Sequence, residues 1–265
     1  MTPPLAAQVR TLLGTRRFGR PLRAFTSVPS TNTVAMEWAA QAASEGSTVV
    51  AEYQTAGRGR LGRIWDAAPG QNLLFSVVLR PQFAPEKLNL ITLCASIAVA
   101  EAVDAVTSPL DTSIKWPNDI LLEGRKCCGM LLESTTGIAG DRTVILGVGL
   151  NVNQRDFAAG LEDQATSLML QTGRQISRAT LLADILLRIE SYYDRLQSNA
   201  RGLRVAYSAR LDGIGHRATV TWSLRDGRTS GIIQGITETG ALRLRTENGT
   251  KICHAGEVAS HRRTA

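Results

Sequence analysis

The sequence predicts an α+β fold, in which a mixed, mainly antiparallel sheet with flanking helices is followed by a small C-terminal β-barrel. Two observations predict the first part: segments with helical and strand-like periodicity alternate up to about residue 211, and the strand-like segments come in pairs. A third predicts the barrel, because eight glycines between residues 213 and 256 divide the remaining chain into short β-type runs. We therefore expect an N-terminal helical segment (1–21), a large domain (22–213) and a small one (214–265).

The chain begins with an expected helix. Leu5, Val9, Leu12 and Leu13 recur at helical spacing, so they form a face that packs on the rest of the protein. The first 25 residues also contain five arginines and no acidic residue, a composition shared by organellar transit peptides. A packed helix is the preferred interpretation, and a transit peptide is the alternative.

The remaining elements follow from periodicity. Apolar positions at a helical period predict further helices at 33–44, 88–106 and 179–196. Ser30 and Thr31 precede the first of these, and either side chain is suited to cap it. Short apolar runs predict strands of the large sheet at 48–52, 73–79, 129–135 and 143–150, and barrel strands at 217–222, 229–234, 241–245 and 250–254.

The net charge of +7 is unevenly distributed along the chain. Residues 215–265 hold eight basic and four acidic side chains, whereas residues 26–214 hold 17 basic and 19 acidic ones. The large central part is therefore not a polyanion-binding surface overall. The 43% of hydrophobic residues is enough to build a core, which excludes a disordered protein.

Membrane insertion, disulfides and structural metals are not expected. The longest nearly apolar run, 88–103, is interrupted by polar residues and is shorter than the roughly 20 residues of a membrane span. The four cysteines form no zinc-binding spacing, and no secretory signal precedes Arg10. We therefore expect reduced thiols in a cytoplasmic protein.

The most informative segment is 57–65, which reads GRGRLGRIW. It interleaves three glycines with three arginines, which are Gly57, Gly59 and Gly62 and Arg58, Arg60 and Arg63. Glycines allow a backbone to bend and to approach a ligand closely, and guanidinium groups bind anionic oxygens. The segment matches neither a Walker A loop nor a dinucleotide fingerprint. It predicts a loop that wraps an anionic ligand, with a solvated basic turn or a nucleic-acid contact as the alternative.

Three further motifs follow in the chain. KWPND (115–119) ends a short strand with two polar side chains, Arg125 and Lys126 precede Gly129 and an apolar strand, and GVGLNV (147–152) is a strand whose glycines leave space on one face. Each motif alone is weak, because Pro-Asn-Asp is usually a turn and glycine in a strand usually marks close packing. Their order along the chain carries more information.

Taken in order, the motifs resemble those of the biotin protein ligases. Ser30-Thr31-Asn32, GRGRLGR with Trp65, KWPND, the step from Lys126 to Gly129 and GVGLNV resemble the family's successive motifs. GITETGALRL (235–244) and the segment 255–258 resemble its C-terminal barrel. The resemblance implies a catalytic domain that binds biotin and ATP over 22–213, related in plan to lipoate ligases and class II tRNA synthetases, and an SH3-like domain over 214–265.

The same resemblance implies the activity and the site. Biotin would be activated by ATP with Mg²⁺ as biotinyl-5′-AMP and then transferred to a lysine of a biotin carboxyl carrier protein. The implied catalytic residues are Lys126, Arg58 and Arg60. The implied biotin-binding residues are Ser30, Thr31, Asn32, Gln54, Gly57, Arg58, Gly59, Arg60, Lys126 and Gly129. The implied ATP-binding residues are Arg58, Arg60, Arg63, Trp65, Asn118, Asp119, Lys126 and Asn151.

Two features depart from the family's pattern. Cys127 and Cys128 stand where small or aliphatic residues often follow the lysine. Both can act as small hydrophobic side chains, and the alternative is that a thiol beside Lys126 is reactive. About 21 residues precede the ligase-like part, which is room for one helix and not for the winged helix-turn-helix of bifunctional members. We therefore expect a monofunctional ligase without specific DNA binding, and the oligomeric state is left open.

Two other functions are compatible with parts of the sequence. A lipoate or octanoyl ligase has a related domain, but it is expected to lack the combination of GRGRLGR and KWPND. A basic RNA-binding protein predicts aromatic residues interleaved with the basic ones. Aromatic residues make up 5% of the chain, and the barrel region holds Trp222 alone, so the ligase interpretation is preferred.

Overall fold

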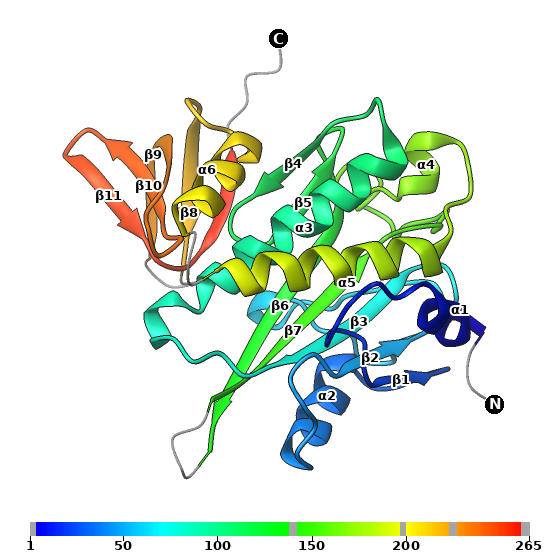
Figure 1. The fold of residues 1–265 in the computed structure, drawn as a ribbon. Helices are drawn as coiled ribbons and strands as arrows, with labels where there is room; N and C mark the ends of the chain where they lie inside the picture. Colours follow the sequence, from blue (N-terminus) through cyan, green and yellow to red (C-terminus); the bar gives the residue numbers. More distant parts are fainter. Residues whose placement is uncertain (1–3, 138–141, 197–199, 223–226, 261–265) are drawn as a thin grey trace.

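The computed structural model describes residues 4–137, 142–196, 200–222 and 227–260, which form two sheets with helices packed around the larger one (Figure 1). The strands of the large sheet are β1 (Leu22–Phe25), β2 (Thr48–Ala51), β3 (Leu73–Leu79), β4 (Thr112–Lys115), β5 (Asp119–Leu122), β6 (Arg125–Thr136) and β7 (Arg142–Leu150). Their order is β1-β2-β3-β7-β6-β5-β4, and the β1–β2 pair is parallel while the other pairs are antiparallel. The expected mixed, mainly antiparallel sheet is confirmed.

The two faces of this sheet are covered by different helices (Figure 1). Helices α3 (Asn89–Thr107) and α5 (Arg178–Arg195) pack on one face, and α1 (Pro4–Leu12) packs on α5. Because side chains alternate along a strand, neighbouring residues reach opposite faces: Val77 belongs to the core beneath α3, whereas Val78 and Ile145 pack under α2 (Thr31–Ala40).

Helix α3 is the most apolar helix of the protein. The helical stretch Pro85–Thr107, which joins the short η2 (Pro85–Lys87) to α3, is long and apolar enough to cross a membrane by length and composition. However, 72% of its most apolar window is buried inside the protein. Burial on this scale is what a central core helix requires, since its apolar surface is removed from water by the sheet and by α5.

The second sheet lies beside α6 (Ala200–Arg210) at one end of the large sheet (Figure 1). Its strands are β8 (Arg217–Thr221), β9 (Arg228–Ile236), β10 (Leu242–Thr246), β11 (Gly249–Cys253) and β12 (Glu257–Ser260). They are antiparallel in the order β11-β10-β9-β8-β12. The Trp116 indole Nε1 donates to Gly240 O at 2.9 Å, so the KWPND turn is tied directly to this sheet.

The structure adds elements that the periodicity of the sequence did not predict: β1, β5, the last barrel strand β12 and the helices α4 (Leu168–Thr172) and α6. The missed strands have four residues each, so they offer little periodicity. Helix α6 carries three arginines in eleven residues, so its composition is polar on average. The helix predicted at 33–44 extends from Thr31 to Ala40, and Ser30 stands at its N-cap position without a capping hydrogen bond from its side chain, so the expected side-chain cap is wrong.

The buried hydroxyl of Tyr207 gives a test of the packing between α6 and the large sheet. Tyr207 is fully buried, and its hydroxyl has no hydrogen-bond partner among the described residues. Burial raises the pKa of this phenol well above its ordinary value, so it stays neutral. Because an unpaired buried hydroxyl destabilises a fold, Tyr207→Phe is expected to leave the free energy of unfolding unchanged or to raise it by up to about 1 kcal/mol.

The control is Tyr192→Phe, since the Tyr192 hydroxyl donates to Glu101 Oε1 at 2.6 Å. That variant is expected to lose about 1 kcal/mol. Urea unfolding followed by circular dichroism measures both. A clear loss of stability in Tyr207→Phe, equal to that of Tyr192→Phe, would show that the Tyr207 hydroxyl is paired in solution.

Candidate active site

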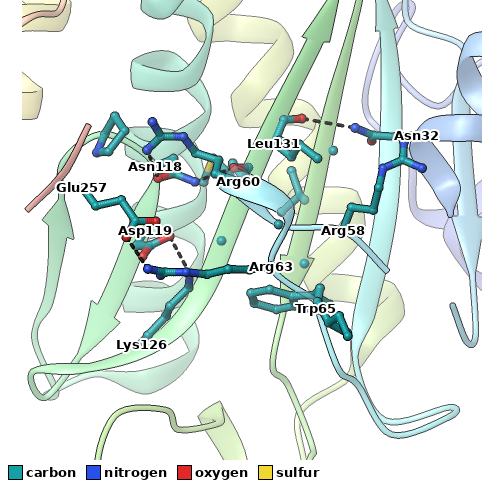
Figure 2. Close-up of a pocket in the computed structure, with 18 of the residues that line it drawn as sticks. Asn32, Arg58, Arg60, Arg63, Trp65, Asn118, Asp119, Lys126, Leu131 and Glu257 are labelled. Atoms are coloured by element: carbon teal, nitrogen blue, oxygen red, sulfur yellow. Dashed lines mark hydrogen bonds and ion pairs between the residues drawn. The ribbon is translucent and has the colours of Figure 1, made fainter. Parts of the chain in front are cut away.

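A cleft opens on the face of the large sheet that also carries α2, next to the N-terminal end of that helix (Figure 2). The loop 57–65, the turn 115–119 and the start of β12 complete its walls. The predicted site residues that line it are Ser30, Thr31, Asn32, Gln54, Arg58, Gly59, Arg60, Arg63, Trp65, Asn118, Asp119, Lys126 and Gly129. Its free volume is about 150 Å³, below the roughly 300–1,000 Å³ of typical small-molecule sites.

Glycines in β6 and β7 form the floor of the cleft. Gly129 and Gly149 face each other in register, and Gly147 lies two residues before Gly149 on the same face of β7. A Cβ atom on Gly149 would lie 2.4 Å from Trp65 Cε2, and one on Gly147 would lie 2.2 Å from Asn32 Oδ1. The glycines of GVGLNV are therefore required because the indole and the amide approach the strand backbone directly.

One wall of the cleft is a hydrogen-bonded network at the start of α2. Gln54 Oε1 accepts from the backbone N of Thr31 at 2.8 Å and lies 3.0 Å from its hydroxyl. Ser76 Oγ lies 2.6 Å from Asn32 Oδ1, and Asn32 Nδ2 donates to Glu133 Oε2 at 2.6 Å. The Asn32 side chain is thus engaged by the protein itself, while the Gln54 amide is oriented with its Nε2 group left to donate elsewhere.

Three of the cations that line the cleft are paired with carboxylates of the same chain, and Figure 2 draws the pairs of Lys126 and Arg63. Arg58 contacts Glu133 at 3.1 Å and Lys126 contacts Asp119 at 2.7 Å. Arg63 pairs with Glu257, which belongs to β12 of the second sheet. Neither Glu133 nor Glu257 was predicted as a site residue, because sequence spacing gives no sign of a partner 75 or 194 positions away.

The Arg60 side chain contacts two other walls of the cleft. Its Nη1 donates to Gly256 O at 3.1 Å and lies 3.3 Å from Asn118 Oδ1, so it joins the loop both to the second sheet and to the KWPND turn. Burial lowers the pKa of Arg60 from its ordinary value, and the nearby carboxylates of Glu257 and Asp119 oppose that effect. The guanidinium remains charged at neutral pH.

The backbone of Lys126 is hydrogen-bonded to the segment 164–166. Its backbone N donates to Gln164 O at 2.8 Å, and its carbonyl accepts from Thr166 N at 2.9 Å. Asn151 supports this arrangement, since its Nδ2 donates to Thr166 O at 3.1 Å. The Nζ atom of Lys126 lies 5.5 Å from the centroid of the Trp65 ring, within cation–π distance.

Two predicted site residues lie outside the lining of the cleft. Asn151 is buried behind the floor, although its Oδ1, like Trp65 Nε1, is a buried polar atom without a partner among the described residues. Gly57 shapes the loop: its carbonyl accepts from Trp65 N at 2.9 Å, and a Cβ atom here would lie 2.4 Å from Trp65 O. Within the described ranges, no group of three or more His, Cys, Asp or Glu side chains is placed to hold a metal.

Of the two alternatives for Cys127 and Cys128, reactive thiols or small packed side chains, the structure favours the second. Cys127 and Cys128 are fully buried, and the Cys127 Sγ–H group points to Ile120 O at 3.5 Å. Burial raises the pKa of Cys127 to about 12 and that of Cys128 well above its ordinary value. Both thiols act as small core side chains, because the thiolate needed for reaction is suppressed.

The large domain and the C-terminal domain each match a known protein family. Residues 24–151 match the model described as "Biotin/lipoate A/B protein ligase family", and residues 219–259 match "Biotin protein ligase C terminal domain". A "Bifunctional ligase/repressor BirA" of Bacillus spizizenii is 36% identical over 95% of this chain and 78% of its own length. A "Biotin--[acetyl-CoA-carboxylase] ligase" of Paracoccus denitrificans is 33% identical over 86% of this chain and 96% of its own.

A solved structure agrees with these matches. The biotin protein ligase from Aquifex aeolicus in complex with biotin and ATP superposes with a TM-score of 0.80 and 30% identity, covering 91% of this chain and 98% of that one.

The burial of the thiols predicts their reactivity. All four cysteines, Cys94, Cys127, Cys128 and Cys253, are buried and unpaired. In the native protein we expect none of them to react with an aromatic disulfide reagent within minutes, because the reagent needs an accessible thiolate. After unfolding in guanidinium chloride all four are expected to react. Rapid release of one or two equivalents of thiolate reporter from the native protein would place Cys127 or Cys128 at an accessible site.

Proposed function

Since the chain belongs to the biotin protein ligase family, we propose that its cleft carries out the family's reaction with the residues described above. The protein activates biotin with ATP as biotinyl-5′-AMP and then transfers the biotinyl group to a lysine of a biotin carboxyl carrier protein. The structural observation that carries this proposal is the convergence of Arg58, Arg60, Arg63 and Lys126 on one glycine-floored cleft.

The first step requires such a concentration of positive charge. The biotin carboxylate attacks the α-phosphorus of ATP and pyrophosphate leaves, so an anion has to approach a polyanion. Two like charges 4 Å apart repel by about 4 kcal/mol at an effective dielectric constant near 20. Fixed cations that face both anions offset this repulsion, and they do so most strongly where charge develops in the transition state.

The geometry favours a division of roles within the cleft. We assign the ureido ring of biotin to Ser30, Thr31 and Gln54, since the Gln54 amide is held by Thr31 with donors to spare. Lys126, aided by Arg58 and Arg60, is assigned to the carboxylate and the α-phosphate. Lys126 is an electrostatic clamp in this scheme: its Nζ exchanges Asp119 for ligand oxygens and forms no covalent bond.

The adenine is assigned to the region around Trp65. The indole offers a stacking face, and its Nε1, which lies against the floor at Gly149, is a buried donor without a partner among the described residues. A buried polar atom without a partner is costly, so a ligand that pairs with this atom gains that free energy on binding. Asn151 lies behind the floor, and it supports the site through Thr166.

The free volume of the cleft is too small for biotin and ATP together. We therefore propose that the loop 57–65 moves outward to admit the substrates and closes over them afterwards. Two of its contacts are suited to such movement, because the ion pairs of Arg58 and Arg63 are partly exposed to solvent and each stabilises the closed loop only weakly.

A magnesium ion fits the donors of the KWPND turn. Asn118 and Asp119 bring an amide oxygen and a carboxylate to the cleft side by side, and Mg²⁺ usually binds through one or two carboxylates together with substrate phosphates. When bound there, the ion neutralises charge on the phosphate oxygens. The protein's own part is to hold these two oxygens in place, which the bond from Asn118 Nδ2 to Met130 O at 2.6 Å does for Asn118.

The substrate assignment predicts a specific exchange reaction. The purified protein is expected to exchange pyrophosphate into ATP when biotin and Mg²⁺ are present, because adenylation is reversible and the site is built to activate a carboxylate. Lipoate or octanoate at the same concentration is the matched control and is expected to support little exchange. Exchange with lipoate in place of biotin would overturn the assignment and favour the related ligase activity.

The role of Lys126 predicts a defect in adenylation without a defect in folding. Loss of a charge-assisted hydrogen bond costs about 1.5–3 kcal/mol, and more where the contact strengthens in the transition state. Lys126→Ala is therefore expected to slow single-turnover adenylation by about tenfold to several hundredfold. The control Lys87→Ala removes the same charge from an exposed position outside the cleft and is expected to keep the wild-type rate. A wild-type rate in Lys126→Ala would remove this residue from the site.

A further inference from the structure

A serine lies beneath the polar wall of the cleft and is not part of its lining. Ser76 of β3 is fully buried, so a ligand in the cleft does not contact it. In the sheet it lies opposite Gly147 of β7, and residues opposite each other point to the same face. Because Gly147 has no side chain, Asn32 Oδ1 approaches the floor at this point and lies 2.6 Å from Ser76 Oγ.

Ser76 belongs to a chain of four polar groups that ends in an amide oxygen on each side. Its Oγ lies 2.6 Å from Asn32 Oδ1 and 2.7 Å from Thr31 Oγ1. Thr31 Oγ1 in turn lies 3.0 Å from Gln54 Oε1. Both terminal amides are fixed with their oxygens toward the hydroxyls, because Asn32 Nδ2 donates to the Glu133 carboxylate at 2.6 Å and Gln54 Oε1 accepts from Thr31 N at 2.8 Å.

This chain of groups is one hydrogen-bond donor short. An amide oxygen only accepts, and each hydroxyl has one proton to donate. The three oxygen–oxygen contacts therefore share the two protons of Ser76 and Thr31, whichever way the hydroxyls turn. One contact always lacks a proton, which is unfavourable in a buried site. Thr31 lines the cleft, so a ligand can supply the missing donor there.

We propose that Ser76 is a positioning residue that prepares Thr31 Oγ1 to accept a hydrogen bond from a ureido N–H of biotin. The inference rests on the proposed function, which assigns the ureido ring to this wall. Once the N–H donates to Thr31 Oγ1, the Ser76 proton is left to Asn32 Oδ1. The Thr31 proton is left to Gln54 Oε1, so every contact then has a donor. An acid without an N–H, such as lipoate, leaves the chain short, so this network favours the cyclic urea.

The test is the variant Ser76→Ala, with Ser47→Ala as the matched control. Ser47 is also fully buried, but it precedes β2 and is outside the lining of the cleft. Calorimetry measures the dissociation constants of biotin and of two cyclic carbamate analogues, in each of which one ureido N–H is replaced by a ring oxygen. Biotin-dependent pyrophosphate exchange measures kcat and the KM values for biotin and ATP.

In Ser76→Ala, Thr31 loses the shorter of its two side-chain contacts, so its hydroxyl no longer has a fixed orientation. The dissociation constant and the KM for biotin are expected to rise about three- to tenfold, as for the loss of one ordinary hydrogen bond. The values of kcat and of KM for ATP are expected to stay within about twofold of the wild type. Ser47→Ala is expected to change none of these values.

The two analogues separate an effect on the ureido contact from a general effect on packing. The analogue that lacks the N–H facing Thr31 is expected to bind the wild type and Ser76→Ala alike, because it makes no contact that Ser76 prepares. The other analogue keeps that N–H, and its affinity is expected to weaken in parallel with that of biotin.

Two results would overturn the inference. Unchanged affinity for biotin in Ser76→Ala would show that the serine does not act on the ureido contact. An equal loss for biotin and for both analogues would assign Ser76 to packing alone, because such a loss does not depend on an N–H. Failure of the proposed function itself would be seen separately, as the absence of biotin-dependent exchange in the wild-type protein.

Discussion

The repulsion between the cationic side chains that line one cleft is the constraint on which the rest of the site depends. Within a few ångströms these charges destabilise the folded state unless they are neutralised. The chain neutralises them from three directions, with a carboxylate on β6, one at the KWPND turn and one on β12 of the second sheet. These are Glu133, Asp119 and Glu257, which pair with Arg58, Lys126 and Arg63. The repulsion within the basic motif is therefore offset by carboxylates from other parts of the fold and not by the loop itself.

This requirement explains why the cleft lies where the two sheets meet. Arg60 and Arg63 find their partners on the second sheet, and Trp116 donates to Gly240 there as well. Below them the strands have to come close enough for an indole to rest on the backbone, which the glycines of β6 and β7 permit. A side chain at Gly149 would push Trp65 outward and separate the loop from its carboxylate partners.

The sequence was sufficient for the parts of the fold and site that are local. Long periodic elements such as α3, α5 and β3 were predicted to within one or two residues, and thirteen of the fifteen predicted site residues line one cleft, because each belongs to a short motif. The sequence did not predict which residues far apart in the chain form ion pairs and hydrogen bonds with each other. Glu133 and Glu257 carry no local signal, and neither does the support that Asn151 gives to Lys126 through Thr166. The fate of Cys127 and Cys128 likewise depends on what packs around them.

The carboxylates that neutralise the cleft also determine how a ligand enters it. An anion that binds Arg63 has to replace Glu257, and one that binds Lys126 has to replace Asp119. Each exchange replaces one ion pair by another. The favourable free energy of binding is therefore small for a single weak anion and larger for a ligand that presents several negative oxygens at once. A neutral ligand would leave an unpaired charge if it displaced a carboxylate, which is strongly unfavourable. Because Glu257 belongs to the second sheet, an anion that takes its place on Arg63 removes one contact between that sheet and the loop, while the bond from Arg60 to Gly256 O is a second contact that does not involve Glu257.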